Sequence, residues 1–357
     1  MFEGSLKLTR ARIFRIFAFT AIFFVAINIA VSFALPSFVD LKRASEQLLS
    51  DNVCNFALAD FADINTMMES DEKKKIILLG DSVSFGIGVE NESESVSGYL
   101  RKNFPDYSVY NLSSCGSKPL DYYFWINRFK KEDAIFVIQY NYKWFAVDNG
   151  ELEERVSQKK ILTEFDKYVD DEIQKWLGDA VTIGDKASHI LTKNIPVAAN
   201  RTKLFAAFLN EKSKEDFVAH VFFGKPETQS MAYKQQYWKD KEEMKSYNCK
   251  IYYPVQLWDV EKNFNFAMYM KTLEFVKGES LNTVVILPPY NGTLLKKCMN
   301  TGFEENISQF IEKAQEKGIK AVSFAGLVDE KYFLDDMHLN AEGNRQFADL
   351  LSKEITQ

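Results

Sequence analysis

The sequence predicts an α/β fold with a central parallel sheet. Short apolar segments bounded by polar residues or glycine have the composition of buried parallel strands, and they cover residues 75–80, 107–112, 134–139, 283–288 and 319–324. Helical periodicity separates several of them, over residues 95–103, 120–129 and 304–317. Strands and helices in alternation indicate right-handed crossovers, with helices on both faces of the sheet.

Composition narrows the possible functions. The 357 residues allow one large domain or two. A net charge of −6, from 44 basic and 50 acidic side chains, gives no electrostatic reason to expect a nucleic-acid partner. The aromatic content of 14%, with 30 Phe, fits a well-filled core together with a lipid-facing segment.

An uncharged apolar run near the N-terminus predicts a membrane anchor. Residues 16–35 would form a helix of about 30 Å, which is long enough to cross a bilayer. Lys7, Arg10, Arg12 and Arg15 precede this run, so the positive-inside rule places residues 1–15 in the cytoplasm. We therefore expect a single-pass protein of the cytoplasmic (inner) membrane, with its main domain on the extracytoplasmic side. A cleaved signal peptide is the alternative, because Ser32-Phe33-Ala34 has small residues at suitable spacing.

The rest of the chain divides into four predicted parts. Residues 36–72 are expected to form a short helical stalk, and residues 73–144 and 281–357 to supply the two parts of the α/β domain. Residues 145–280 form an insertion with helical periodicity over 164–176 and 264–275. A loop of this length cannot be structureless in a compact domain, so we expect a helical cap over a substrate cleft. The alternative is that the insertion packs elsewhere as stabilising bulk.

A serine directly after the first predicted strand is a candidate nucleophile. The apolar residues 76–79 end at Gly80, which permits a sharp turn and leaves Ser82 at the carboxyl edge of the sheet. Open α/β folds bind their ligands at this edge. Asp81 is expected to accept hydrogen bonds that hold the turn. The nearby Gly86-Ile87-Gly88 lacks the glycine spacing of a dinucleotide site and the lysine of a P-loop, so we expect no cofactor.

His338 is the best candidate for the base that such a serine needs. The chain has three histidines, and only His338 has a carboxylate three residues upstream, Asp335, which could fix the tautomer of the ring. His189 and His220 lie in amphipathic stretches and are expected to be packed or solvated helix residues.

The cysteines have neither CxxC nor His-rich spacing, so we expect no metal site. An exported domain permits disulfides, but Cys54, Cys115, Cys249 and Cys298 allow three pairings, among which the sequence does not choose. We expect Cys115 to be a small packing residue.

Four short blocks of the chain resemble the SGNH (GDSL-type) serine hydrolases. They are residues 80–86 (GDSVSFG), 111–116 (NLSSCG), 136–141 (FVIQYN) and 335–338 (DDMH). The third block departs from the family, which usually has glycine two residues before the asparagine, where this chain has Gln139. The similarity covers residues 73–145 and 281–350, and it implies a flavodoxin-like three-layer SGNH hydrolase fold.

The resemblance also implies roles for individual residues. Ser82 would be the nucleophile, His338 the base and Asp335 the residue that orients His338. The oxyanion hole would consist of the N–H groups of Ser82 and Gly116 and the side-chain amide of Asn141.

The resemblance further implies an activity, the hydrolysis of O-acyl esters, above all acetyl esters, on a cell-envelope glycan or lipid. An O-acetyltransferase that passes the acyl group to a polysaccharide hydroxyl is the first alternative, with a membrane acyltransferase as its partner. A catalytically silent scaffold of an envelope-assembly complex is the second.

Overall fold

A parallel β-sheet forms the centre of the molecule. The structure is a computed structural model that describes residues 10–38, 58–89, 92–145, 155–157, 159–178, 181–199, 238–240, 263–295 and 303–356. The sheet has five strands in the order β2-β1-β3-β4-β5, and all neighbouring pairs are parallel. The strands are β1 (Lys75–Leu79), β2 (Ser108–Asn111), β3 (Ala134–Gln139), β4 (Thr283–Leu287) and β5 (Lys320–Ser323). The predicted α/β class is confirmed, and each strand lies within one of the predicted segments.

Both faces of the sheet are buried, which explains why the central strands β1, β3 and β4 are nearly continuous apolar runs. Successive side chains of a strand point to opposite faces. In β1, Ile77 and Leu79 enter a larger core on one face, whereas Ile76 and Leu78 enter a smaller core on the other.

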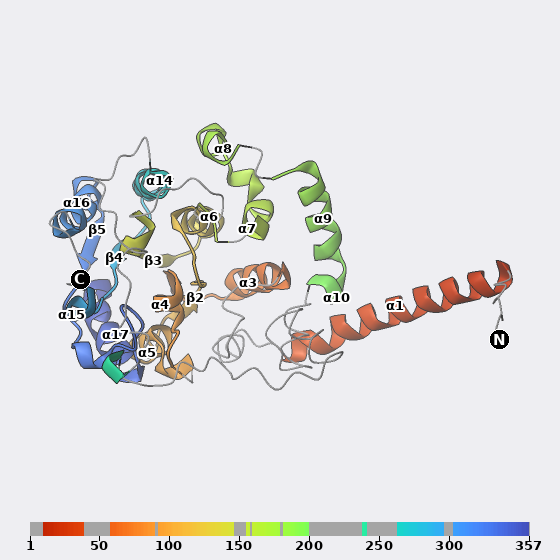
Figure 1. Cartoon of the computed structure of the whole chain (residues 1–357), viewed down its shortest axis with the longest axis horizontal. Coiled ribbons are helices and arrows are strands. Elements are labelled where there is room, and N and C mark those ends of the chain that lie inside the picture. The colour runs from red at the N-terminus through yellow and green to blue at the C-terminus, as the bar shows by residue number, and fades with distance from the viewer. Residues whose placement is uncertain are drawn as a thin grey trace, which may run out of the picture.

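Helices cover the two faces in separate layers (Figure 1). The larger core is closed by α3 (Leu58–Ser70), α6 (Pro119–Phe129), α14 (Phe264–Gly278) and α16 (Phe303–Glu316). The smaller core is closed by α5 (Val96–Asn103) and α17 (Ala341–Thr356). Short elements join these layers: α4 (Ser82–Phe85), η1 (Glu92–Glu94), η2 (Tyr142–Phe145), α15 (Gly292–Leu295) and η7 (Glu330–Tyr332).

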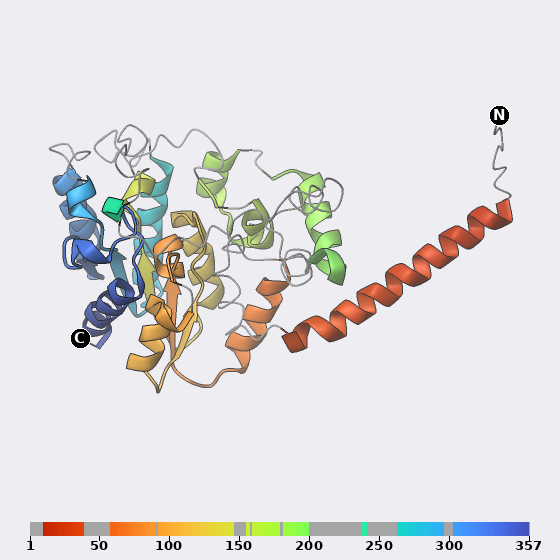
Figure 2. The same ribbon diagram turned by 60° about the horizontal axis from the view of Figure 1, so that its bottom comes forward.

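The N-terminal helix α1 (Arg10–Phe38) extends away from the sheet domain (Figure 2). It contains the predicted transmembrane segment, residues 16–35. Within the part of the chain that the structure describes, no helix combines the length and apolar character needed to cross a bilayer. The transmembrane assignment is therefore not supported.

Residues assigned to the stalk pack into the sheet domain instead. In α3, Phe61, Ile64 and Met68 are buried in the larger core. Phe61 stacks on Trp125 of α6, with ring centroids 5.5 Å apart. Hydrophobic burial of these three side chains attaches α3 to the domain.

The described part of the insertion is mainly helical. It contains α7 (Lys159–Glu164), η4 (Asp166–Tyr168), α8 (Asp171–Leu177), α9 (Ile183–Asn194), α10 (Pro196–Ala199), η5 (Trp238–Asp240) and α14. The helix expected over 164–176 is broken, because Asp170 caps a new helix by accepting a hydrogen bond from Ile173 N at 3.0 Å. The long α14 contains the predicted helix 264–275 and packs against the sheet as part of the larger core.

Candidate active site

The turn after β1 presents Ser82 at the carboxyl edge of the sheet. Asp81 is the N-cap of α4, a single helical turn that starts at Ser82, and its Oδ1 accepts a hydrogen bond from Val83 N at 3.0 Å. Gly80 is required by close packing, because a Cβ there would lie 2.6 Å from Gln139 Oε1 and 2.8 Å from Ser84 Oγ. Ser82 itself is partly exposed.

A tight loop after β5 presents His338 to the serine. The loop closes on itself, since Leu334 N donates to His338 O at 2.8 Å and Phe333 forms a bridge with Leu339. Gly88 lets the segment after α4 approach this loop. With φ at +109°, its added Cβ would lie 2.5 Å from Leu334 Cδ1 and 2.8 Å from Leu339 O.

Ser82, His338 and Asp335 form a hydrogen-bonded chain. His338 Nε2 lies 2.9 Å from Ser82 Oγ, and His338 Nδ1 lies 2.7 Å from Asp335 Oδ2. A carboxylate at Nδ1 favours the tautomer that carries its proton there, which leaves Nε2 free to accept from the hydroxyl. Only 13% of the His338 side chain and 10% of the Asp335 side chain are exposed.

Asp335 also holds the backbone of its own loop. Its Oδ1 accepts hydrogen bonds from Met337 N at 2.9 Å and from His338 N at 2.8 Å. Although burial opposes it, the nearby imidazole and these N–H donors lower the pKa of Asp335. Burial likewise opposes the charged form of His338, but Asp335 outweighs it and raises the pKa of His338 above its ordinary value. The pair is therefore an ionised carboxylate beside a strengthened base.

Two backbone N–H groups that the resemblance assigns to the oxyanion hole have no acceptor in the part of the chain that the structure describes. Among the described residues, no acceptor pairs with the N–H of Ser82 or with the N–H of Gly116, which lies in the turn after β2. An added Cβ at Gly116 would meet no described atom within 4 Å, so this turn borders open space. Free N–H groups at the carboxyl edge can stabilise negative charge on a substrate oxygen.

Asn141, which follows β3, is the third predicted oxyanion donor. Its Nδ2 donates to Asp81 Oδ2 at 2.6 Å and faces Met337 Sδ at 3.4 Å, while its Oδ1 accepts from Lys143 N at 3.0 Å. A thioether sulfur is a weak acceptor. The N–H that faces Met337 is therefore the one that a substrate oxyanion could take over at little cost.

Asp81 joins the ends of β1 and β3, which confirms its predicted role in holding the turn. Besides Val83 N and Asn141 Nδ2, its carboxylate accepts from Gln139 Nε2 at 3.0 Å. The Gln139 Oε1 accepts from Ser84 N at 3.2 Å. Sequence reasoning identified Gln139 only as a departure from a family pattern and gave it no role.

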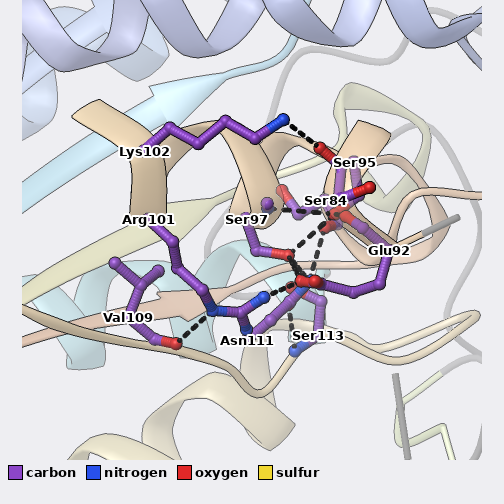
Figure 3. Close-up of polar contacts among 11 residues, drawn as sticks. Ser84, Glu92, Ser95, Ser97, Arg101, Lys102, Val109, Asn111 and Ser113 are labelled. Carbon is purple, nitrogen blue, oxygen red and sulfur yellow. Dashed lines mark hydrogen bonds and ion pairs between the residues drawn. The ribbon is translucent and has the colours of Figure 1, made fainter. Parts of the chain in front are cut away.

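A second polar network holds the turn from the side of β2 (Figure 3). Asn111, the last residue of β2, donates to Ser84 O at 2.9 Å and to Ser97 Oγ at 3.0 Å, and accepts from Ser113 N at 3.1 Å. One side chain thus connects α4 with the loop that leads to Gly116. Behind it, Ser97 and Arg101 of α5 both bond to Glu92.

Asn291, which follows β4, supports the histidine loop and was not predicted. It is fully buried, its N donates to Asp336 O at 2.8 Å, and its Nδ2 donates to Asp335 O at 3.3 Å. Its position three residues after the predicted strand 283–288 was the available signal. Next to it, the Asp336 carboxylate pairs with Lys143 Nζ at 2.6 Å.

Of the remaining chemically interesting residues, Cys115 directly precedes Gly116, and the others lie apart from this site or outside the described residues. His189 Nε2 lies 3.0 Å from Glu164 Oε2, a hydrogen bond between α9 and α7, as suits a helix residue without a catalytic role. His220, Cys54, Cys249 and Cys298 lie outside the described residues. Cys115 is disulfide-bonded, so its prediction as a simple packing residue is wrong.

Comparison with known proteins does not assign a family. No family model matches the chain, and no curated protein matches it. Among solved structures, it is similar to the acetyl xylan esterase AlAXEase, with a TM-score of 0.40 and 10% identity over 78% of this chain and 98% of that chain. It is also similar to a G-D-S-L family protein from Desulfitobacterium hafniense described as lipolytic, with a TM-score of 0.31 and 12% identity over 78% and 98%. Similarities at this level carry no weight for the function of this chain.

The site brings together a hydroxyl, an imidazole and a carboxylate in one hydrogen-bonded chain. The hydroxyl and base lie within hydrogen-bonding distance, which is the geometry that activation of a nucleophile requires. Such an arrangement can attack a carbonyl carbon and hold the resulting oxyanion.

Proposed function

We propose that this protein is an SGNH-type serine esterase that cleaves O-acyl esters through an acyl-serine intermediate. The observation that carries the proposal is the pair of contacts at His338, 2.9 Å from Nε2 to Ser82 Oγ and 2.7 Å from Nδ1 to Asp335 Oδ2. Acetyl esters of a cell-envelope glycan or lipid are the proposed substrates, and they come from the resemblance in the sequence.

In the acylation half of the reaction, His338 Nε2 removes the proton from Ser82 Oγ as that oxygen bonds to the ester carbonyl carbon. The carbonyl electrons move onto the oxygen, which the N–H groups of Ser82 and Gly116 and the Asn141 amide stabilise. Asp335 stabilises the imidazolium that forms. The C–O bond of the ester then breaks, and the leaving alcohol takes the proton from His338.

In the deacylation half, an acceptor hydroxyl attacks the acyl-serine while His338 again removes its proton. The bond between the acyl carbon and Ser82 Oγ then breaks, and Ser82 Oγ takes the proton back from His338. Water as the acceptor releases a carboxylic acid, which is hydrolysis. A sugar hydroxyl as the acceptor gives a new ester, which is O-acyl transfer. The same residues serve both outcomes, so transferase activity, with a membrane acyltransferase as partner, remains the alternative.

Hydrolysis of p-nitrophenyl acetate by the purified protein tests the proposal. We expect turnover by the wild type and background rates for Ser82→Ala. A wild type no faster than Ser82→Ala would favour the scaffold alternative. The matched control is Ser188→Ala on α9, which removes a surface hydroxyl outside the site and should keep the wild-type rate.

A second assay separates hydrolysis from transfer. The protein is incubated with an acetyl-ester donor and an oligosaccharide, and the sugar is analysed by mass spectrometry. A gain of one acetyl group on the sugar, absent with Ser82→Ala, would identify a transferase. Free acetate with an unmodified sugar would identify an esterase.

We also propose that the domain acts on the extracytoplasmic side of the membrane. This proposal comes from the basic residues that precede the apolar run 16–35. Protease added to spheroplasts, in which only the cytoplasmic membrane is intact, should degrade the domain, whereas full protection until the spheroplasts are lysed would place it in the cytoplasm.

A further inference from the structure

The side chain of Gln139 occupies the space beside the nucleophile turn. Gln139 is the last residue of β3, is fully buried, and follows Ile138, which pairs with Leu79 of β1. It therefore lies next to Gly80, where an added Cβ would come within 2.6 Å of its Oε1. The missing side chain of Gly80 makes room for the carboxamide of Gln139.

The carboxamide forms hydrogen bonds with Asp81, the residue before Ser82, and with Ser84, two residues after it. Its Nε2 donates to Asp81 Oδ1 at 3.0 Å, and its Oε1 accepts from Ser84 N at 3.2 Å. Asp81 is 1% exposed, so loss of this donor would leave a buried carboxylate with fewer partners. One side chain thus fixes the residue before and the residue two after the nucleophile.

Side chains from the two strands beside β1 bind the N–H and the carbonyl of Ser84 in the short helix α4. The N–H of Ser84 is held by Gln139 of β3, and its carbonyl is held by Asn111 of β2 at 2.9 Å (Figure 3). Since β1 lies between β2 and β3, the turn that follows β1 is fixed from both sides.

We propose that Gln139 is a positioning residue for catalysis: it sets the place of Ser82 Oγ relative to His338 through its bonds to Asp81 and Ser84. The inference rests on the proposed role of Ser82 as nucleophile. To bind both Asp81 and Ser84, the side chain at position 139 needs a hydrogen-bond donor and an acceptor. Glutamine has both, methionine has neither a comparable donor nor a comparable acceptor, and glutamate has a donor only when it is protonated.

Two substitutions separate this role from simple packing. Gln139→Met keeps the length of the side chain and removes both hydrogen bonds. Gln139→Glu keeps both bonds while Glu is protonated, because its O–H can donate to Asp81 and its carbonyl can accept from Ser84. When both carboxylates are ionised, they repel each other and the donor is lost.

The matched control is Tyr269→Phe. It removes a buried hydroxyl that donates to Phe310 O at 2.6 Å between α14 and α16, on the face of the sheet opposite α4. This change should lower the melting temperature without moving the nucleophile.

The experiment measures the second-order rate of labelling by a fluorophosphonate, with the melting temperature of each full-length variant. We expect Gln139→Met to be labelled about 10- to 100-fold more slowly than the wild type, because small displacements of a reacting group have effects of this size. Tyr269→Phe should be labelled at the wild-type rate. For Gln139→Glu, kcat/KM for p-nitrophenyl acetate should fall as the pH rises, over a range where the wild-type value rises.

The outcomes distinguish this inference from the proposed function. If the wild type is labelled and Gln139→Met reacts as fast as Tyr269→Phe, the inference is wrong and the proposed function stands. If neither the wild type nor Tyr269→Phe is labelled, the proposed function fails and the inference fails with it. If Gln139→Met does not fold, the pH profile of Gln139→Glu decides: a profile parallel to the wild type would overturn the inference.

Discussion

Replacement of Asp335 by asparagine tests how much the buried carboxylate supports the base. Asparagine keeps an acceptor for the N–H groups of Met337 and His338, which Asp335 Oδ1 holds at 2.9 and 2.8 Å. Its amide group, however, would face His338 Nδ1, which now lies 2.7 Å from a carboxylate oxygen. The ring would then carry its proton on Nε2 and could not accept from Ser82.

The size of the loss follows from these contacts. A hydrogen bond to a charged group is worth about 1.5–3 kcal/mol, and the wrong tautomer adds to that cost. The same exchange in a Ser-His-Asp triad lowers kcat by about 10⁴. We expect kcat to fall by about 10³- to 10⁴-fold, or ~4–5.5 kcal/mol of transition-state stabilisation.

The assay is steady-state hydrolysis of p-nitrophenyl acetate, with circular dichroism to compare the folded content. Asp336→Asn is the matched control, because it removes an adjacent carboxylate that pairs with Lys143 at 2.6 Å and not with the imidazole nitrogens. We expect its kcat to fall far less than that of Asp335→Asn, because Asp336 affects the pKa of His338 only through its charge and makes no hydrogen bond to the ring. A folded Asp335→Asn protein with kcat within threefold of the wild type would refute the role given to Asp335.

Three further predictions concern other groups. The pKa of His338 is raised, so we expect kcat/KM to fall with decreasing pH through a midpoint above the ordinary histidine value of about 6.5, because the protonated ring cannot act as a base. A pH-rate profile with a midpoint at or below that value would contradict this. Asn141→Ala should lower kcat by about 10²- to 10³-fold with little change in KM, whereas an unchanged kcat would remove Asn141 from the oxyanion hole. Burial raises the pKa of Asp121 to about 6, so its ionisation destabilises the folded state as the pH rises through that value. Asp121→Asn should therefore raise the melting temperature at pH 7.5 more than at pH 4.5, and an equal change at both pH values would show that Asp121 does not titrate there.

The sheet could be predicted because its three central strands, β1, β3 and β4, are largely buried on both faces. Such strands are short apolar runs with clear ends, and β3 begins and ends where its pattern does. The pairing of Ser82 with His338 could be predicted from chemistry, because a nucleophile needs a base and only one histidine has a suitably spaced carboxylate. Their catalytic roles stay predictions until activity is measured.

Other features depend on contacts that periodicity does not report. A helix predicted within residues 36–72 does not show which surface it packs on, so these residues were expected to form a stalk, although Phe61 and Met68 of α3 enter the larger core. Gln139 and Asn291 act through side chains that reach across strand ends, and their partners are distant in sequence. The sequence could not predict which cysteine pairs with Cys115, because four cysteines allow three sets of pairings.

The identity of the acylated residue tests the central claim most directly. The protein is treated with a fluorophosphonate, digested, and mapped by tandem mass spectrometry. We predict one adduct per chain, on Ser82, and none in His338→Ala. An adduct on another residue, or equal labelling of Ser82 in His338→Ala, would contradict the assignment of nucleophile and base.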